Sequence, residues 1–290
     1  LFTRLRPLPG AGCALLGAGL ACGLAFGLHQ HELWLPVAGA HVGLALAYLG
    51  GLGLRLTGEE RRRARMQRLF GKYVSDGVVE RLLRTGRDPD LGGEARTVTV
   101  LFSDIRSFTT ISERLSAQEV VEMLNAYFSR VCDAILEHEG TIDKFVGDAV
   151  MAVFGSPHTC RDHARKALRA ALAMRDIAGR FAGWMEERFA GRDLPRFEIG
   201  IGVHTGDAVV GNIGSTRRLE FTVIGDTVNT ASRLEGVTKD LGVRIVVSAQ
   251  TVAAAGSGLR LGKNDRVVVK GRREAVEVHE LVDLVEEEQG

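Results

Sequence analysis

The chain opens with two long apolar runs and continues with short apolar segments that alternate with amphipathic ones. The two runs cover residues 10–28 and 33–54, and a short polar link at 29–32 separates them. A helix needs roughly 20 apolar residues to cross the core of a bilayer, and both runs come close to that length. Because a signal peptide has one such run and a cleavage site, two in tandem favour a transmembrane helical hairpin over residues 1–56.

Positive charge lies at both ends of this hairpin. Arg4 and Arg6 precede it, an arginine-rich stretch at 59–65 follows it, and the link between the runs has no Lys or Arg. The positive-inside rule places both ends in the cytoplasm, so we expect a multi-pass protein of the cell (inner) membrane, embedded in the lipid bilayer. A hairpin buried in a soluble protein is the alternative.

Residues 57–94 are expected to connect this hairpin to a globular domain. Apolar positions recur at helical spacing within the charged stretch 57–84, which predicts a helical linker or transducer that can pair with its copy in a second chain. Pro89 and the Gly92-Gly93 pair after it are typical of a loop.

From residue 95 to residue 284 strand-like and helix-like segments alternate, which predicts one α/β (α+β) domain. The Ser-x-x-Glu pattern at 116–119 is a capping box that opens an amphipathic helix, and further helices are predicted at 164–181 and 227–241. Strands are predicted at 97–102, 141–146, 149–154, 197–203, 208–213, 221–224, 244–247, 259–261, 266–269 and 276–281, with hairpin turns at the Gly-Asp steps 147–148 and 206–207. The order strand–helix–strand–strand–helix–strand is ferredoxin-like, a sandwich with one helical face.

Overall charge and cysteine content narrow the function only slightly. The formal net charge is +1, which gives no general attraction to nucleic acid, so no nucleic-acid partner is expected. The four cysteines lack the close spacing of metal ligands, and a reduced cytosolic domain fits them better than a disulfide scaffold.

Two aspartates stand at the ends of predicted neighbouring strands. Asp104 follows the strand at 97–102, and Asp148 lies in the hairpin turn at 147–148. Carboxylates placed in this way can converge on divalent cations, and oxygen ligands suit Mg²⁺ or Mn²⁺. A pair of such cations can stabilise the attacking and leaving oxygens of a displacement at phosphorus. Taken alone, loop aspartates are more often solvated or capping residues.

Four stretches of sequence change this interpretation. Residues 100–113 (VLFSDIRSFTTISE) and 142–155 (IDKFVGDAVMAVFG) resemble the two metal-binding motifs of class III adenylyl cyclases. Residues 202–206 (GVHTG) and 221–235 (FTVIGDTVNTASRLE) resemble two further motifs of that family, and all are in the family's order. The resemblance covers about residues 95–282 and points to the membrane-bound bacterial type and to a subgroup that carries Thr at one base-reading position.

The resemblance implies a set of groups that hold the metals and the triphosphate. Asp104 and Asp148 would bind two divalent metal ions, Mg²⁺ or Mn²⁺, with the backbone carbonyl of Ile105 as a further ligand. Phe108 and Thr109 begin a helix whose N-terminal amide groups would face the triphosphate, as the helix dipole favours. In a loop near the end of the domain, Lys270 resembles a lysine that contacts phosphate.

The resemblance also implies a base-recognition pair and a transition-state pair. Lys144 would contact the adenine ring and Thr222 would occupy the second base-reading position, whereas guanylyl cyclases usually carry Glu and Cys there. Asn229 would orient the ribose, and Arg233 would stabilise charge on the transferring phosphoryl group, a role that suits a bidentate guanidinium. One departure is Gly200, where many members carry an arginine that helps to bind phosphate.

These residues predict an adenylate cyclase that converts ATP to 3′,5′-cyclic AMP and pyrophosphate. Catalytic domains of the family pair head to tail, so a homodimer is expected in which each site takes residues from both chains. A guanylyl or mixed-specificity cyclase is the first alternative. A non-catalytic nucleotide-binding sensor module is the second, and it is disfavoured because all six key positions are filled.

Overall fold

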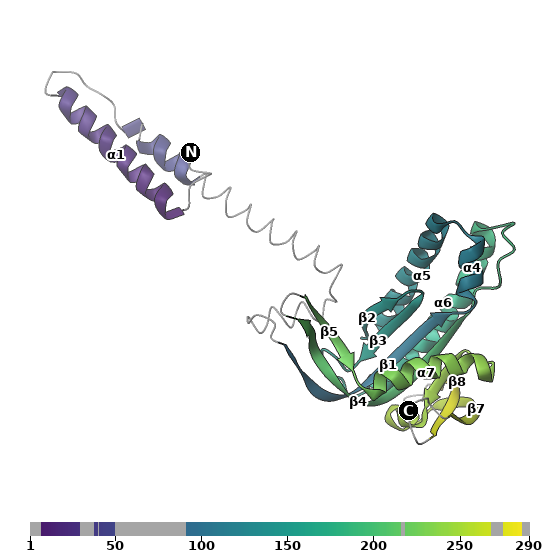
Figure 1. Cartoon of the computed structure of the whole chain (residues 1–290). Helices are drawn as coiled ribbons and strands as arrows, with labels where there is room; N and C mark the ends of the chain where they lie inside the picture. Colours follow the sequence, from purple (N-terminus) through teal and green to yellow (C-terminus); the bar gives the residue numbers. More distant parts are fainter. Residues whose placement is uncertain are drawn as a thin grey trace. The chain divides into compact units, whose positions relative to one another are not determined.

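The computed structural model describes residues 7–29, 38–39, 41–49, 91–215, 218–267 and 275–285 (Figure 1). The chain divides into two compact units, Leu1–Val74 and Ser75–Gly290. Most of the predicted linker 57–94 and the loop that carries Lys270 lie outside the described residues.

The N-terminal unit contains helices where the apolar runs predict them. Helix α1 spans Pro7–His29, and residues 41–49 are helical as well. The two segments touch, because a β-carbon added at Gly17 would lie 3.5 Å from a methyl group of Leu44. Among the residues that the structure describes, however, no helix is both long enough and apolar enough to cross a membrane. The transmembrane hairpin expected over residues 1–56 stays a prediction, because part of this range lies outside the described residues.

The second unit is built on an eight-stranded sheet with strand order β2-β3-β1-β4-β6-β8-β7, and β5 pairs with β4 outside this path. The strands are β1 Gly92–Ile105, β2 Thr141–Val146, β3 Ala149–Phe154, β4 Ile199–Ser215, β5 Arg218–Ile224, β6 Ile245–Ser248, β7 Leu259–Val267 and β8 Val276–Leu284. The first four lie in the order β2-β3-β1-β4, which is the ferredoxin-like arrangement that the sequence predicts.

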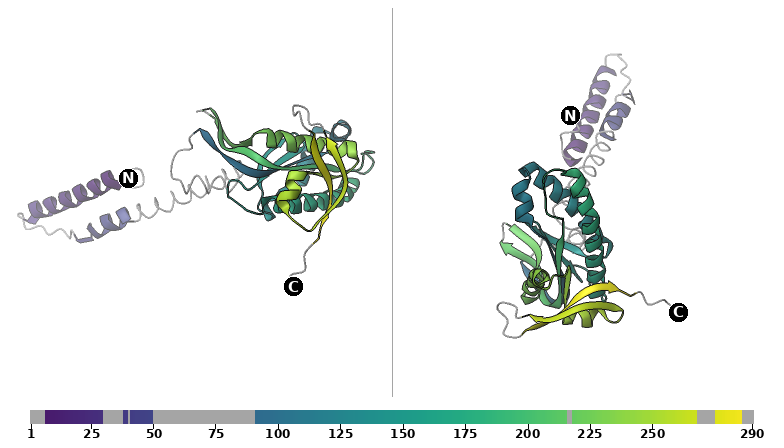
Figure 2. Two further views of the ribbon diagram at one scale, coloured as in Figure 1. Left: turned by 90° about the horizontal axis from the view of Figure 1, so that it is seen from below. Right: turned by 90° about the vertical axis from the view of Figure 1, so that its right-hand side faces the viewer.

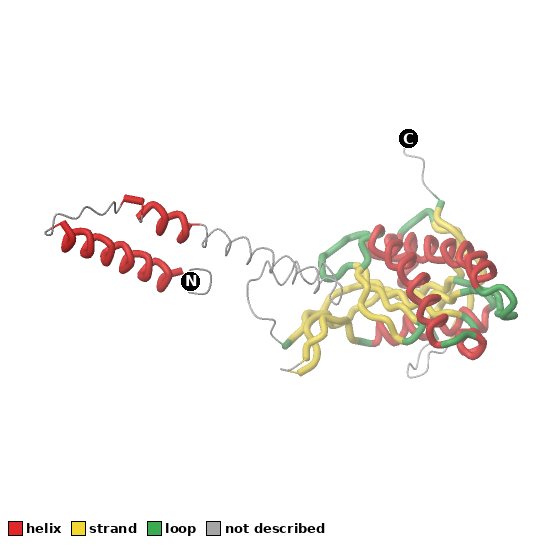
Figure 3. Tube along the Cα trace, turned by 90° about the horizontal axis from the view of Figure 1, so that it is seen from above, coloured by secondary structure: helices red, strands yellow, loops and turns green. Residues whose placement is uncertain are grey.

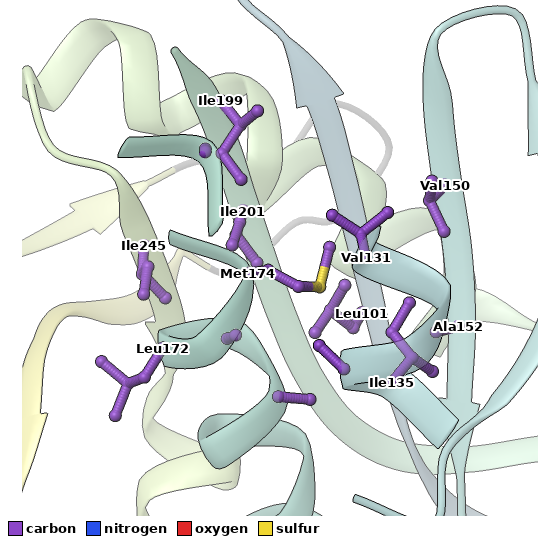
Figure 4. Close-up of a cluster of buried hydrophobic side chains, with 14 of the residues drawn as sticks. Leu101, Val131, Ile135, Val150, Ala152, Leu172, Met174, Ile199, Ile201 and Ile245 are labelled. Carbon is purple, nitrogen blue, oxygen red and sulfur yellow. The ribbon is translucent and has the colours of Figure 1, made fainter. Parts of the chain in front are cut away.

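Helices pack on both faces of the sheet. They are α4 Phe108–Arg114, α5 Ala117–Glu137, α6 His163–Arg188, α7 Asp226–Leu241 and α8 Ala249–Ala255. The main core joins α5 and α6 to one face, as in the contacts of Val131, Ile135 and Met174 with Leu101 and Ile201 (Figure 4). The predicted capping box of α5 is present, since the Ser116 side chain accepts from the Glu119 amide and the Glu119 carboxylate accepts from the Ser116 amide.

Helix α7, labelled in Figure 1, packs on β4 and β1 from the opposite face, so the prediction of a single helical face is wrong. Helices flank the sheet on both sides (Figures 2 and 3). Along β1, Val100 and Leu101 point to opposite faces and both are fully buried. A strand that is apolar on both faces needs cover on both sides. Ala231 of α7 belongs to the second core cluster, together with Val98 and Val100.

The predicted hairpin turn at Gly206-Asp207 is also wrong, because β4 runs through it without a break. Strand β1 is long enough to pair with β4 on both sides of this step, with Gly206 opposite Val98 and Asp207 opposite Thr97. The Thr97 hydroxyl donates to the Asp207 carboxylate over 2.6 Å. Continuous pairing with β1 therefore overrides the local turn preference of the Gly-Asp step.

Candidate active site

The structure brings Asp104 and Asp148 together at one end of the sheet. Ser103 of β1 pairs with Val150 of β3, so the end of β1 lies beside the β2–β3 turn that carries Asp148. The two carboxyl side chains are close enough to share a hydrogen bond. Convergence of the two groups was expected from the sequence, and their role as metal ligands stays a prediction.

A third carboxyl group, Glu235 of α7, lies near this pair. Burial, the hydrogen bond with Asp148, and the negative charges of Asp148 and Glu235 raise the pKa of Asp104 to about 7. Burial and the charge of Asp148 also raise the pKa of Glu235, and the guanidinium of Arg106 opposes this shift. We call Asp104, Asp148 and Glu235 the carboxylate end. Sequence reasoning missed Glu235, although it closes the motif at 221–235.

The carboxylate end fits divalent cations bound together with a phosphorylated ligand. Its three acidic groups concentrate negative charge that the nearby Arg106 only partly offsets. Within the described part of the chain, no three His, Cys, Asp or Glu side chains form a complete metal-binding cluster. Mg²⁺ usually takes only one or two protein carboxylates and completes its shell with phosphate oxygens and water. Asp104 and Asp148, with the Ile105 carbonyl, are a donor set of this kind.

The segment after β1 turns directly into α4. Ser107 precedes the helix in the left-handed conformation, with φ 56°, and the Ile111 amide donates to its carbonyl over 3.0 Å. Phe108 packs against the main core, whereas Thr109 is exposed. The helix therefore begins where the sequence predicts it, and its contact with a triphosphate stays a prediction.

Lys144 and Thr222 are brought into one cluster from β2 and β5. The Thr222 hydroxyl donates to Oδ2 of Asp143 over 2.8 Å. The Lys144 ammonium donates to Oε1 of Glu220 over 2.7 Å and lies 3.5 Å from Oδ2 of Asp143. We call Asp143, Lys144, Glu220 and Thr222 the base cluster. Asp143 and Glu220 were not anticipated from the sequence.

Asn229 and Arg233 lie one turn apart on α7, and a close contact with β4 fixes that helix. A β-carbon added at Gly202 would overlap the backbone of α7 at Glu235 and Ala231. Only glycine permits so close an approach of helix and strand. Asn229 is exposed and Arg233 is half-buried, so both groups remain accessible to a ligand or to a second chain.

Helix α7 also leaves no room for a side chain at Gly200, the position where many members of the resembled family carry an arginine. Gly200 pairs with Asp104 across the β1–β4 ladder. The space above it is filled, because an added β-carbon would overlap the Glu235 carboxylate and the Thr238 hydroxyl. Arg106 donates to the backbone carbonyls of Thr238 and Val243. In this chain the nearby positive charge therefore comes from Arg106, in the turn after β1, and is tied by hydrogen bonds to the C-terminal end of α7 and the loop after it.

A ferredoxin-like domain with these two clusters has the architecture of a class III nucleotidyl cyclase. The family model described as the adenylate and guanylate cyclase catalytic domain matches residues 93–282. The chain belongs to this family.

Two relatives of known class agree with this family assignment. Adenylate cyclase 1 of Rhizobium meliloti (strain 1021) is 39% identical over 219 residues, which cover 74% of this chain and 32% of the relative. The adenylate cyclase of Anabaena cylindrica is 39% identical over 219 residues, which cover 73% of this chain and 42% of the relative. The chain thus spans less than half the length of either protein.

Solved structures with the same fold include cyclases of both specificities. The guanylyl cyclase Cya2 is 36% identical with a TM-score of 0.63, and the match covers 68% of this chain and 96% of that one. The adenylyl cyclase CyaB from P. aeruginosa is 33% identical with a TM-score of 0.58, and the match covers 67% of this chain and 97% of that one. Overall similarity therefore does not decide between ATP and GTP.

Proposed function

We propose that this chain is an adenylate cyclase that converts ATP to 3′,5′-cyclic AMP and pyrophosphate. The observation that carries the proposal is the base cluster, in which Lys144 and Thr222 lie together on β2 and β5. Lysine at the first position donates hydrogen bonds only, which suits the unprotonated N1 of adenine and not the N1–H of guanine. The adenylate cyclases of R. meliloti and A. cylindrica support the same substrate.

In the proposed reaction the ribose 3′-hydroxyl attacks the α-phosphorus, a new P–O bond forms, and the bond to pyrophosphate breaks. Two divalent cations held by Asp104, Asp148 and the Ile105 carbonyl would lower the pKa of the hydroxyl group and neutralise charge on the phosphates. Asn229 would position the ribose, and Arg233 would donate to the phosphoryl oxygens on which charge develops. Amide groups at Phe108 and Thr109, with the Lys270 ammonium, would hold the triphosphate. Positioning and charge stabilisation supply most of the acceleration.

We further propose that the enzyme works as a head-to-tail homodimer. Dimerisation is typical of this family, and apolar side chains beside the base cluster support it: Phe145 and Ile224 are each 46% exposed, and Val146 is 56% exposed. In such a dimer one chain supplies Asp104 and Asp148, and its partner supplies Lys144, Thr222, Asn229 and Arg233. A second copy would remove the exposed apolar groups from water.

A location at the cell membrane, with the catalytic domain in the cytoplasm, stays a prediction. It rests on the apolar runs within residues 1–56 and on the arginines at their ends. Membrane fractionation of cells that express the full chain tests it, and recovery of the intact chain only in the soluble fraction would refute it.

The deciding experiment is a cyclase assay on the purified full chain with Mn²⁺ and either ATP or GTP. We expect cyclic AMP from ATP, and almost none from the Asp104→Ala or Asn229→Ala variant alone. A mixture of these two variants should regain activity, because one of the two hybrid sites carries both native groups. Preferential turnover of GTP would favour the guanylyl alternative. Nucleotide binding without turnover would favour the sensor alternative.

A further inference from the structure

The hydroxyl group of Thr222 already donates a hydrogen bond within the base cluster. It donates to Oδ2 of Asp143 over 2.8 Å, and the Thr222 residue is only 6% exposed. The Asp143 side chain is 4% exposed, so the bond is shielded from competing water. A hydroxyl group has a single hydrogen to donate. Once that hydrogen is directed at Asp143, the Thr222 oxygen can only accept hydrogen bonds from a ligand.

Asp143 holds this position because β2 carries a bulge. Ile142 pairs with Ala152 and Lys144 pairs with the next residue of β3, Met151, so Asp143 is an extra residue without a partner on that strand. In a regular strand two successive side chains point to opposite faces. A bulge breaks this alternation and redirects a side chain. Asp143 and Lys144 can therefore both reach side chains of β5.

The charges around Asp143 support its role as an acceptor. Burial raises the pKa of Asp143, while the hydrogen bond from Thr222 and the positive charge of Lys144, 3.5 Å away, favour the ionised form. An ionised carboxylate accepts hydrogen bonds and cannot donate. The direction of the Thr222 hydrogen bond is then fixed toward Asp143.

Together the cluster presents one donor and one acceptor. Lys144 has three N–H groups and contacts two carboxylates of its own chain, so it can turn one N–H group toward a base, and an ammonium group cannot accept a hydrogen bond. Adenine offers the complementary pair, N1 as an acceptor and the N6 amino group as a donor. Guanine offers the reverse, N1–H as a donor and O6 as an acceptor. Groups left unpaired in such a pocket give strong rejection of the wrong ligand.

We infer that Asp143 is a specificity-determining residue, which selects adenine over guanine by holding the Thr222 hydroxyl as a hydrogen-bond acceptor. This inference rests on the proposed adenylate cyclase activity and deepens it. Asp143 does not touch the base and acts through Thr222, so it is a positioning residue. It also explains how a threonine, which can otherwise donate or accept, discriminates between the two purines.

The test compares kcat/KM for ATP and for GTP in the purified full chain with Mn²⁺. In Asp143→Asn the amide group can donate to the Thr222 oxygen, which frees the hydroxyl hydrogen for O6 of guanine. We expect the ATP-to-GTP ratio of kcat/KM to fall by about tenfold. Adding Thr222→Asp to this variant should restore the ratio, because an ionised aspartate accepts only. A general loss of structure would lower turnover of both nucleotides and would not be rescued.

Glu220→Gln is the matched control, because it removes a charge of the same sign from the same cluster without touching the Thr222 hydrogen bond. It should alter KM for both nucleotides and leave their ratio near that of the wild type. If Asp143→Asn fails to give a folded circular dichroism spectrum, Asp143→Ala serves the same test. ATP turnover with an unchanged ratio in the Asp143 variants overturns the inference alone, whereas a wild-type chain that does not turn over ATP overturns the proposed function.

Discussion

The carboxylate end and the base cluster each bring several acidic side chains together, but their charges are balanced in different ways. At the carboxylate end, burial and the neighbouring negative charge of Asp148 both oppose ionisation of Asp104. The pKa of Asp104 therefore rises to about 7. In the base cluster, Asp143 and Glu220 lie within 3.5 Å and 2.7 Å of the Lys144 ammonium. The negative charge of one region would be balanced by the cations of the proposed mechanism, whereas the side chains of the other already balance one another without a ligand.

This difference matches the two roles proposed for these regions, binding of metal ions and phosphates at the carboxylate end and selection of the base in the base cluster. Carboxylates whose charge Arg106 only partly offsets cost stability in the free protein, and in the proposed mechanism the same charge would attract divalent metal ions and the phosphates they carry. A cluster of paired charges costs less and holds its hydrogen bonds in a fixed direction, as base selection requires. The predictions below perturb one region or the other, beginning with the largest effect.

Replacing Asp104 by Asn should abolish catalysis. The substitution keeps the size of the side chain and removes the charge that would bind the cations, so kcat should fall by about a thousandfold or more. Cyclic AMP formation with Mn²⁺ and ATP is the measurement. Residual activity within tenfold of the wild type would remove the carboxylate end from the mechanism.

Replacing Lys144 by Glu should shift nucleotide preference at the other region. The change turns a donor into an acceptor, which suits N1–H of guanine, so the ATP-to-GTP ratio of kcat/KM should fall by about ten- to a hundredfold. Parallel assays with the two nucleotides measure it. Equal losses for both would mean that Lys144 supports the fold and does not read the base.

Asp104→Asn should also stabilise the metal-free protein above pH 7. The pKa of Asp104 in the folded protein, about 7, lies above the ordinary value of 3.8, so the folded protein loses stability relative to the unfolded chain as the pH rises between these values. Because the group is only half-buried, screening reduces the expected gain to about 1–2 kcal/mol at pH 8, with almost none near pH 4. Urea unfolding in the presence of a chelator measures it. The exposed Asp240→Asn on α7 is the control and should show no such pH dependence.

Glu235→Gln should act in the same direction but more weakly. It removes a smaller contribution to the raised pKa of Asp104, since Glu235 follows burial and Asp148 among the causes. The stability gain at pH 8 should be about 0.5 kcal/mol. Because the substitution lowers the pKa of Asp104, the loss of stability with rising pH should also end at a lower pH. A loss of stability would instead mean that the pairing of Glu235 with Arg106 dominates.

Sequence reasoning recovered the order of the core strands and the convergence of Asp104 with Asp148, because both follow from local patterns and short turns. It failed where distant pairing decides the outcome. The Gly206-Asp207 step looks like a turn until the long β1 is seen to pair with both sides of it. The bulge at Asp143 breaks the alternation on which strand prediction depends, so a contact between Asp143 and Thr222 could not be foreseen.

The fit of α7 on Gly202 has a consequence for control of the enzyme. The backbone of this helix packs on β4 without room for a methyl group at Gly202, and such close packing opposes rolling or sliding of the helix that carries Asn229 and Arg233. We therefore do not expect a regulatory signal to act by moving α7 alone. In the proposed homodimer, such a signal would have to act on whole domains, by changing the angle or the spacing at which the two copies face each other.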